Sequence, residues 1–129
     1  MTILPIYASL LAILFVVLSL RIVGLRRRFK IIIGDADNEL VRRAIRVHAN
    51  FSEYVPLGLM MIYLVEVCKA TPILVHILGL SLFLGRLIHA YGVSQTDENV
   101  RWRISGMSLT FATLLISGSY LLLSYTGLY

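Results

Sequence analysis

Residues 3–20 read ILPIYASLLAILFVVLSL, and this run decides the fold. Within it, only Pro5, Tyr7, Ser9 and Ser19 interrupt the aliphatic and aromatic side chains. A helix of about 20 apolar residues crosses the hydrocarbon core of a bilayer. Pro5 falls in the first turn, where its missing N–H does least harm. The run therefore predicts a membrane-spanning helix, with an expected extent of residues 3–23.

Three more apolar segments follow this first one. We expect the spans at residues 3–23, 44–68, 73–93 and 104–124. The second helix should begin before its span, near Asn38 or Glu39, after the polar loop that starts at Gly34. Four spans with one longer and two short connections predict an all-α, up-and-down four-helix bundle in the membrane. Residues 1–129 form one domain of this kind.

The composition excludes an ordinary soluble protein. Hydrophobic residues make up 58% of the chain and the mean hydropathy is +0.83, whereas roughly 45–50% apolar residues is usual for soluble domains. The net charge is +5, but the basic residues flank apolar runs, which favours anionic lipid or an acidic small ligand over nucleic acid. The one cysteine, Cys68, gives neither an intrachain disulfide nor a metal-ligand spacing. We therefore expect a lipid bilayer as partner, and no nucleic acid and no metal.

The basic residues also predict an orientation. Eight of them gather around the first loop, Arg101 and Arg103 lie in the third, and Lys69 is in the second. By the positive-inside rule, loops one and three are cytoplasmic and both termini lie on the opposite side. In a bacterium the location would be the inner, or cell, membrane.

One stretch is too polar for its place in a membrane helix: RRAIRVHANFSEYVP, residues 42–56. Ionised groups at membrane depth cost a few kcal/mol each and normally face a protein interior or a water-filled cavity. On a helix, Arg43, Arg46, Asn50 and Glu53 share one stripe because they are three or four residues apart. Such a stripe suits a ligand that carries both carboxylates and an amine. The alternative is a salt bridge that neutralises itself.

The pattern Arg46-x-His48-x-Asn50-x-x-Glu53-Tyr54-x-Pro56 resembles the signature of the membrane-associated proteins in eicosanoid and glutathione metabolism, the MAPEG family. The similarity is to its microsomal glutathione transferases and leukotriene C4 synthase, and the chain is identified as a bacterial-type member. The resemblance extends over nearly the whole chain. It implies a homotrimer with sites between neighbouring subunits and glutathione as co-substrate.

The resemblance also assigns site residues. The residues that it implies for glutathione binding are Arg26 or Arg27, Arg46, His48, Asn50, Glu53, Tyr54, Arg86 and His89. His48 is two residues from Arg46, so a structural role is an equal alternative for it. Gly85-Arg86-x-x-His89 is similar to a stretch of prostaglandin E synthase, but the tyrosine that follows in relatives is replaced by Val93.

The catalytic candidates stand at the start of the fourth span. The family has an arginine there that is proposed to activate the thiol of glutathione, and either Arg103 or Arg101 fits, with Arg103 favoured by Arg103-x-x-Gly106. A thiol with a pKa of about 8.5 is mostly protonated at neutral pH, and a nearby guanidinium favours the thiolate. The alternative for both is an anchor at the membrane surface.

These observations favour a glutathione-dependent membrane transferase or peroxidase that acts on lipophilic electrophiles or lipid hydroperoxides. A non-catalytic lipid-binding or scaffolding protein of the same family is the alternative. A small transporter or channel subunit would need a polar path through the membrane, whereas here the polar residues crowd toward one side.

Overall fold

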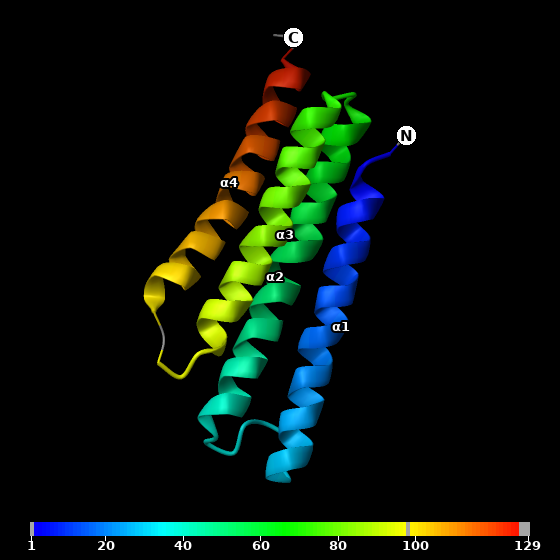
Figure 1. The fold of residues 1–129 in the computed structure, drawn as a ribbon. Helices are drawn as coiled ribbons and strands as arrows, with labels where there is room; N and C mark the ends of the chain where they lie inside the picture. Colours follow the sequence, from blue (N-terminus) through cyan, green and yellow to red (C-terminus); the bar gives the residue numbers. More distant parts are fainter. Residues whose placement is uncertain (1, 98, 127–129) are drawn as a thin grey trace.

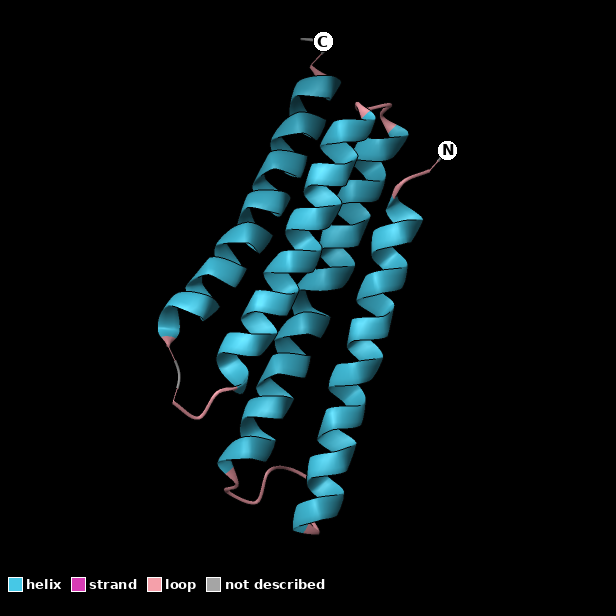
Figure 2. Cartoon of the chain, in the orientation of Figure 1, coloured by secondary structure: helices cyan, strands magenta, loops and turns pink. Residues whose placement is uncertain are grey.

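The computed structural model describes residues 2–97 and 99–126, and these form four long helices (Figures 1 and 2). They are α1 (Leu4–Phe29), α2 (Glu39–Val67), α3 (Pro72–Ser94) and α4 (Val100–Tyr125). No strand occurs in the described ranges. The expectation of an all-α four-helix bundle is confirmed. Figure 1 shows the α1–α2 and α3–α4 connections at one end, and the α2–α3 turn with the two termini at the other.

The helices begin and end where local chemistry dictates. The side chain of Asn38 accepts a hydrogen bond from the backbone N–H of Val41, and the side chain of Asn99 accepts one from that of Arg101. Both contacts satisfy donors that a helix start leaves without partners. At the other end of α1, Lys30 adopts a left-handed conformation (φ 56°). The helix thus extends past residue 23, where the expected membrane span ends, to Phe29 and includes the arginines at 26–28.

Three helices have the length and composition of a membrane span: α1, α3 and α4, among the residues described. The chain is therefore an integral membrane protein. The fourth helix, α2, has 29 residues and carries the charged stretch in its first half. It packs against all three of the others. A crossing by α2 as well remains a prediction from the sequence.

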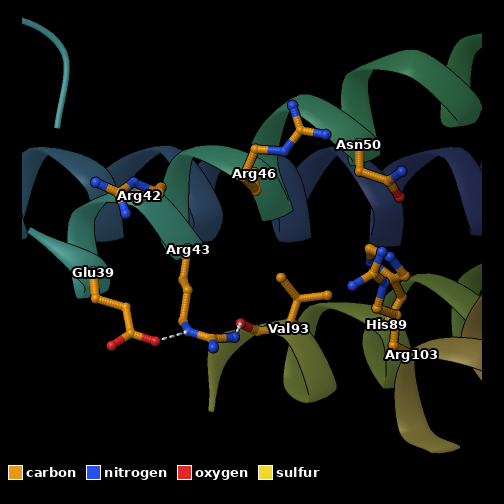
Figure 3. A pocket seen from close by; sticks show the side chains of 8 residues that line it. All are labelled: Glu39, Arg42, Arg43, Arg46, Asn50, His89, Val93 and Arg103. Carbon is orange, nitrogen blue, oxygen red and sulfur yellow. Dashed lines mark hydrogen bonds and ion pairs between the residues drawn. The ribbon is translucent and has the colours of Figure 1, made fainter. Parts of the chain in front are cut away.

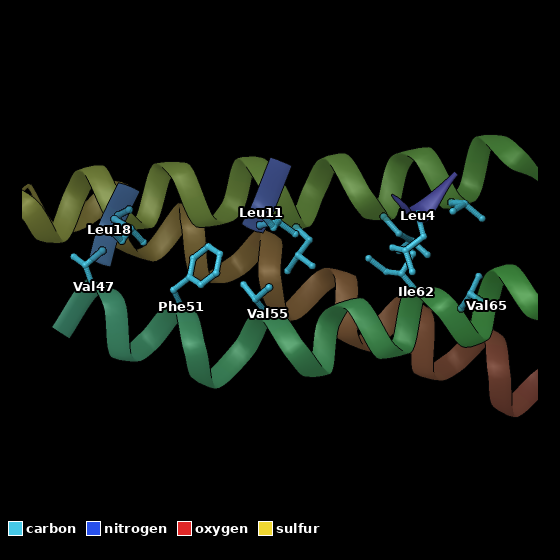
Figure 4. Close-up of a cluster of buried hydrophobic side chains, with 12 residues drawn as sticks. Leu4, Leu11, Leu18, Val47, Phe51, Val55, Ile62 and Val65 are labelled. Carbon is cyan, nitrogen blue, oxygen red and sulfur yellow. The ribbon is translucent and has the colours of Figure 1, made fainter. Parts of the chain in front are cut away.

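Apolar side chains of α1, α2 and α3 form the main core (Figure 4). Leu11 and Leu18 of α1 meet Val47, Phe51 and Val55 of α2, and all five are at most 6% exposed. At the far end, the carboxylate of Glu66 accepts hydrogen bonds from the backbone N–H groups of Ile3 and Leu4. The α2 helix thus caps the start of α1.

The α3–α4 pair packs through small residues. A Cβ atom on Gly106 would lie 2.5 Å from the backbone nitrogen of His89, and one on Gly92 would lie 2.8 Å from the Cβ of Trp102. Glycines at these positions let the two backbones touch, as small residues do between membrane helices. This close approach brings the first turn of α4 against the last turns of α3.

Candidate functional site

A cavity of about 350 Å³ opens between the first half of α2 and the adjoining ends of α3 and α4 (Figure 3). The residues that line it are Glu39, Arg42, Arg43, Arg46, Asn50, His89, Val93 and Arg103. The wall therefore holds four guanidinium groups and one carboxylate. Such a surplus of positive charge in one cavity favours an anionic occupant.

Four of the site residues assigned in the sequence analysis line the cavity together. Arg46 and Asn50 are four residues apart on α2 and project from one face. His89 comes from α3 and Arg103 from the first turn of α4. The last two reach the same cavity because Gly106 allows α4 to touch α3 near His89. The bundle thus unites two separate sequence motifs.

The mouth of the cavity is held by ion pairs. Arg43 Nε contacts Glu39 Oε1 at 2.9 Å, and Arg43 Nη1 donates to the carbonyl of Val93 at 3.2 Å, which ties α2 to α3 (Figure 3). Arg42 contacts Asp35 at 2.6 Å and Asp37 at 3.0 Å. The hydrogen bond from Arg42 lowers the pKa of Asp35, with a backbone N–H from Asp37 adding to the effect. These pairs fold the first loop onto the rim.

Behind the cavity, Arg86 joins three helices. Only 1% of this residue is exposed. Its guanidinium donates to Asn50 Oδ1 and to Thr110 Oγ1, each at 2.7 Å, and to Met107 Sδ at 3.2 Å. It also lies 5.6 Å from the ring centre of Tyr54. Arg86 does not line the cavity, so within one protomer it orients Asn50 and Tyr54 from behind.

Other candidate residues lie away from the cavity. Arg26 and Arg27 line a different hollow, at the end of α1. His48 faces α1, where its Nε2 lies 3.0 Å from Ser19 Oγ and its ring packs on Phe15. Glu53 and Arg101 are exposed and do not line the cavity. Of the stripe predicted on α2, three residues thus line the cavity and Glu53 does not.

Sequence reasoning missed several members of the site. Glu39 and Arg42 line the cavity, and Thr110 and Met107 hold Arg86. For the first two, the helical spacing from Arg46 was an available signal, since 39, 42 and 46 follow the same three- and four-residue steps. For Thr110, which looks like one more apolar-span residue, the sequence offers no comparable signal.

Comparison with known proteins identifies the family. Residues 4–123 match the MAPEG family. The chain belongs to the MAPEG family. The resemblance found in the sequence is thereby confirmed. This MAPEG chain is similar to inner membrane protein YecN of Escherichia coli strain K12, with 38% identity over 110 residues, which are 85% of this chain and 82% of the relative. YecN of strain O6:H1 gives the same values. No solved structure matches the chain significantly.

Proposed function

We propose that this MAPEG chain is a glutathione-dependent membrane enzyme that acts on lipophilic electrophiles or lipid hydroperoxides. The observation that carries the proposal is the composition of the cavity, in which Arg46, Asn50 and Arg103 from distant parts of the sequence line one wall. Glutathione carries two carboxylates, an ammonium and amide groups. The arginines suit the carboxylates, the amide of Asn50 suits a peptide group, and Glu39 supplies a carboxylate for the ammonium.

The chemistry requires an ionised sulfur. We assign its stabilisation to Arg103, which stands in the first turn of α4, where the helix dipole adds to the positive field. The thiol proton leaves through the open mouth of the cavity to water. The thiolate then attacks the electrophilic carbon of a lipophilic substrate and forms a thioether. In a substitution the leaving group departs as an anion with the electron pair of the broken bond, and in an addition to an activated double bond the π electrons move to the adjacent carbon, which takes a proton from water. Arg101 is the alternative, although it is exposed and outside the cavity.

The assembly is part of the same proposal. In one protomer, Arg26 and Arg27 lie in a separate hollow, and Glu53 is exposed. A homotrimer, in which a neighbouring subunit brings its α1 arginines to this cavity, would complete the set. The exposed apolar residues of α1, such as Ile13 at 62% and Leu20 at 63%, support burial against a neighbour or lipid. We also propose that α2 crosses the membrane, in the inner membrane as the name of YecN suggests, with loops one and three cytoplasmic.

One observation favours the second candidate, a non-catalytic lipid-binding or scaffolding protein. Val93 lines the cavity and contributes an isopropyl group where relatives have a tyrosine hydroxyl one turn after the histidine. A donor available to those relatives is therefore missing from this wall. The experiment below separates the two candidates.

The test is the ultraviolet absorbance of thiolate when purified protein is mixed with glutathione, followed by conjugation of a generic lipophilic electrophile. Wild type should form thiolate at neutral pH, and Arg103→Ala should abolish the signal, whereas Arg101→Ala should keep it. Glutathione affinity measured by calorimetry serves as the control for Arg103→Ala. No thiolate and no turnover in wild type, despite glutathione binding, would favour the non-catalytic candidate.

A further inference from the structure

The basic end of α1 lies at the depth of lipid headgroups. The helix has 26 residues, so it is about 39 Å long at 1.5 Å per residue. The hydrocarbon core of a bilayer is about 30 Å thick, and the headgroup layer adds about 6 Å on each side. With Leu4 near one surface, the last turns of α1 pass beyond the core on the other. Arg26, Arg27 and Arg28 then stand among the phosphates.

The chain that follows presents apolar side chains to the outside. After Lys30 turns in the left-handed conformation, the backbone N–H of Ile31 donates to the carbonyl of Arg26 at 2.9 Å. Ile32 is 95% exposed and Ile33 is 85% exposed. Two largely exposed isoleucines beside a cluster of cations are typical of segments that dip into the acyl-chain boundary.

Between the arginines and the isoleucines there is a hollow of about 480 Å³, lined by Val23, Arg26, Arg27, Lys30, Ile31 and Ile32. Its base is aliphatic and its edge is cationic. Arg26 donates to the carbonyl of Gly34 at 3.3 Å, which holds the loop over the hollow. Arg27 from the last turn of α1 and Lys30 from the left-handed turn that ends the helix both line it.

The acids of the first loop do not neutralise this edge. Asp35 and Asp37 both pair with Arg42, and Glu39 pairs with Arg43. Within residues 2–97 and 99–126, the ion pairs leave the cations of the hollow without a carboxylate. An amphiphilic anion, with a phosphate for the edge and an acyl chain for the base, has the complementary chemistry.

We propose that this hollow binds an anionic phospholipid of the surrounding membrane. The headgroup phosphate lies between Arg27 and Lys30, and the acyl chains run along Val23 and Ile32. The binding positions the first loop, which also forms the rim of the basic cavity through Arg42. The site uses Arg27 and Lys30, so in the trimer proposed above it leaves Arg26 as the α1 arginine for the glutathione cavity of a neighbouring subunit.

The test is native mass spectrometry of the detergent-purified full-length protein, titrated with phosphatidylglycerol or with phosphatidylcholine of the same acyl chains. Wild type should retain phosphatidylglycerol preferentially. Each cation near an anionic headgroup contributes about a fivefold change in affinity, so the double variant Arg27→Gln/Lys30→Gln should lose about 25-fold. The charge-matched control Arg28→Gln/Lys69→Gln removes two exposed cations that do not line the hollow, of which only Arg28 lies at the same end of the bundle, so it should lose at most about fivefold.

Three results would overturn the proposal. The first is equal retention of both lipids by wild type. The second is an equal loss in both double variants, which would indicate general surface charge instead of a defined site. The third is displacement of phosphatidylglycerol by millimolar glycerol 3-phosphate or reduced glutathione, which would make the hollow a site for soluble anions. Ile32→Ser/Ile33→Ser tests the apolar half, and it should weaken retention of phosphatidylglycerol without removing the preference for it over phosphatidylcholine.

Discussion

Replacing the buried Arg86 tests whether its hydrogen bonds or its volume stabilises the bundle. Arg86→Ala leaves Asn50 Oδ1 without the donor now at 2.7 Å. An orphaned buried acceptor costs about 1–3 kcal/mol, and the lower part of that range applies here because Asn50 is only partly buried and lines the cavity. Thr110 loses less, because its hydroxyl still donates to the carbonyl of Gly106 at 3.0 Å. The void left by a large side chain adds about 2–5 kcal/mol. Relief of the buried charge offsets part of this sum, so we expect Arg86→Ala to destabilise the protein by about 4 kcal/mol.

Arg86→Met separates the two contributions. Methionine fills much of the same volume and carries no charge, so only the cost at Asn50 remains, and the expected loss is at most about 2 kcal/mol. The measurement is equilibrium unfolding by dodecyl sulfate in mixed micelles, followed by circular dichroism. Arg28→Ala, an exposed arginine on α1, is the control and should change the free energy of unfolding by less than about 0.5 kcal/mol. A methionine variant as unstable as the alanine variant would refute the packing argument.

Three further predictions concern the cavity, the first loop and the α3–α4 contact. Arg46→Ala should weaken glutathione binding by about 2–5 kcal/mol if a neighbouring subunit covers the cavity as proposed, because a ligand carboxylate then loses its partner away from water, and unchanged affinity by calorimetry would contradict the assignment. The hydrogen bond from Arg42 lowers the pKa of Asp35 in the folded protein, so ionised Asp35 stabilises the loop at pH values above its ordinary pKa of 3.8. This stabilisation is lost as the pH falls through the lower pKa of the folded state. Limited proteolysis of the loop should show this acid transition in wild type, and Asp35→Asn should remove it. Gly106→Ala should cost about 1–3 kcal/mol or more, since the added Cβ meets backbone atoms of α3 at 2.5 and 2.6 Å, whereas Gly118→Ala, whose Cβ finds only a methionine methyl at 3.8 Å, should be neutral or stabilising in the same unfolding assay.

The sequence was sufficient for the helices because their signals are local. The apolar run at residues 3–20 and the caps at Asn38 and Asn99 each act within a few residues. The end of α1 was harder to predict. The predicted membrane span ends at residue 23 because the apolar run ends there, but arginine is a good helix former, and α1 continues to Phe29.

The site was only partly predictable because helical periodicity locates a face and not what packs against it. Spacing placed Arg46 and Asn50 together, and the structure agrees. The same spacing included Glu53, which lies on nearly the same face as Arg46 but about 10 Å further along α2 and does not line the cavity. The burial of Arg86 depends on Thr110, which is 24 residues away in another helix. The helical periodicity of one segment does not show which residue of another helix packs against it.

The cap that Glu66 provides for the start of α1 has a consequence at the opposite end of the helix. Because Glu66 of α2 accepts hydrogen bonds from the backbone N–H groups of Ile3 and Leu4, the N-terminal end of α1 has a fixed position along the bundle axis. The helix is unbroken from Leu4 to Phe29, so the position of its N-terminus also sets the depth in the membrane and the rotation about the helix axis of the arginines at 26–28. One residue inserted in the middle of α1 would advance them by about 1.5 Å and turn them by about 100°. The arginines at the C-terminal end of α1 would then lose their present contacts, while the N-terminal end capped by Glu66 would stay in place.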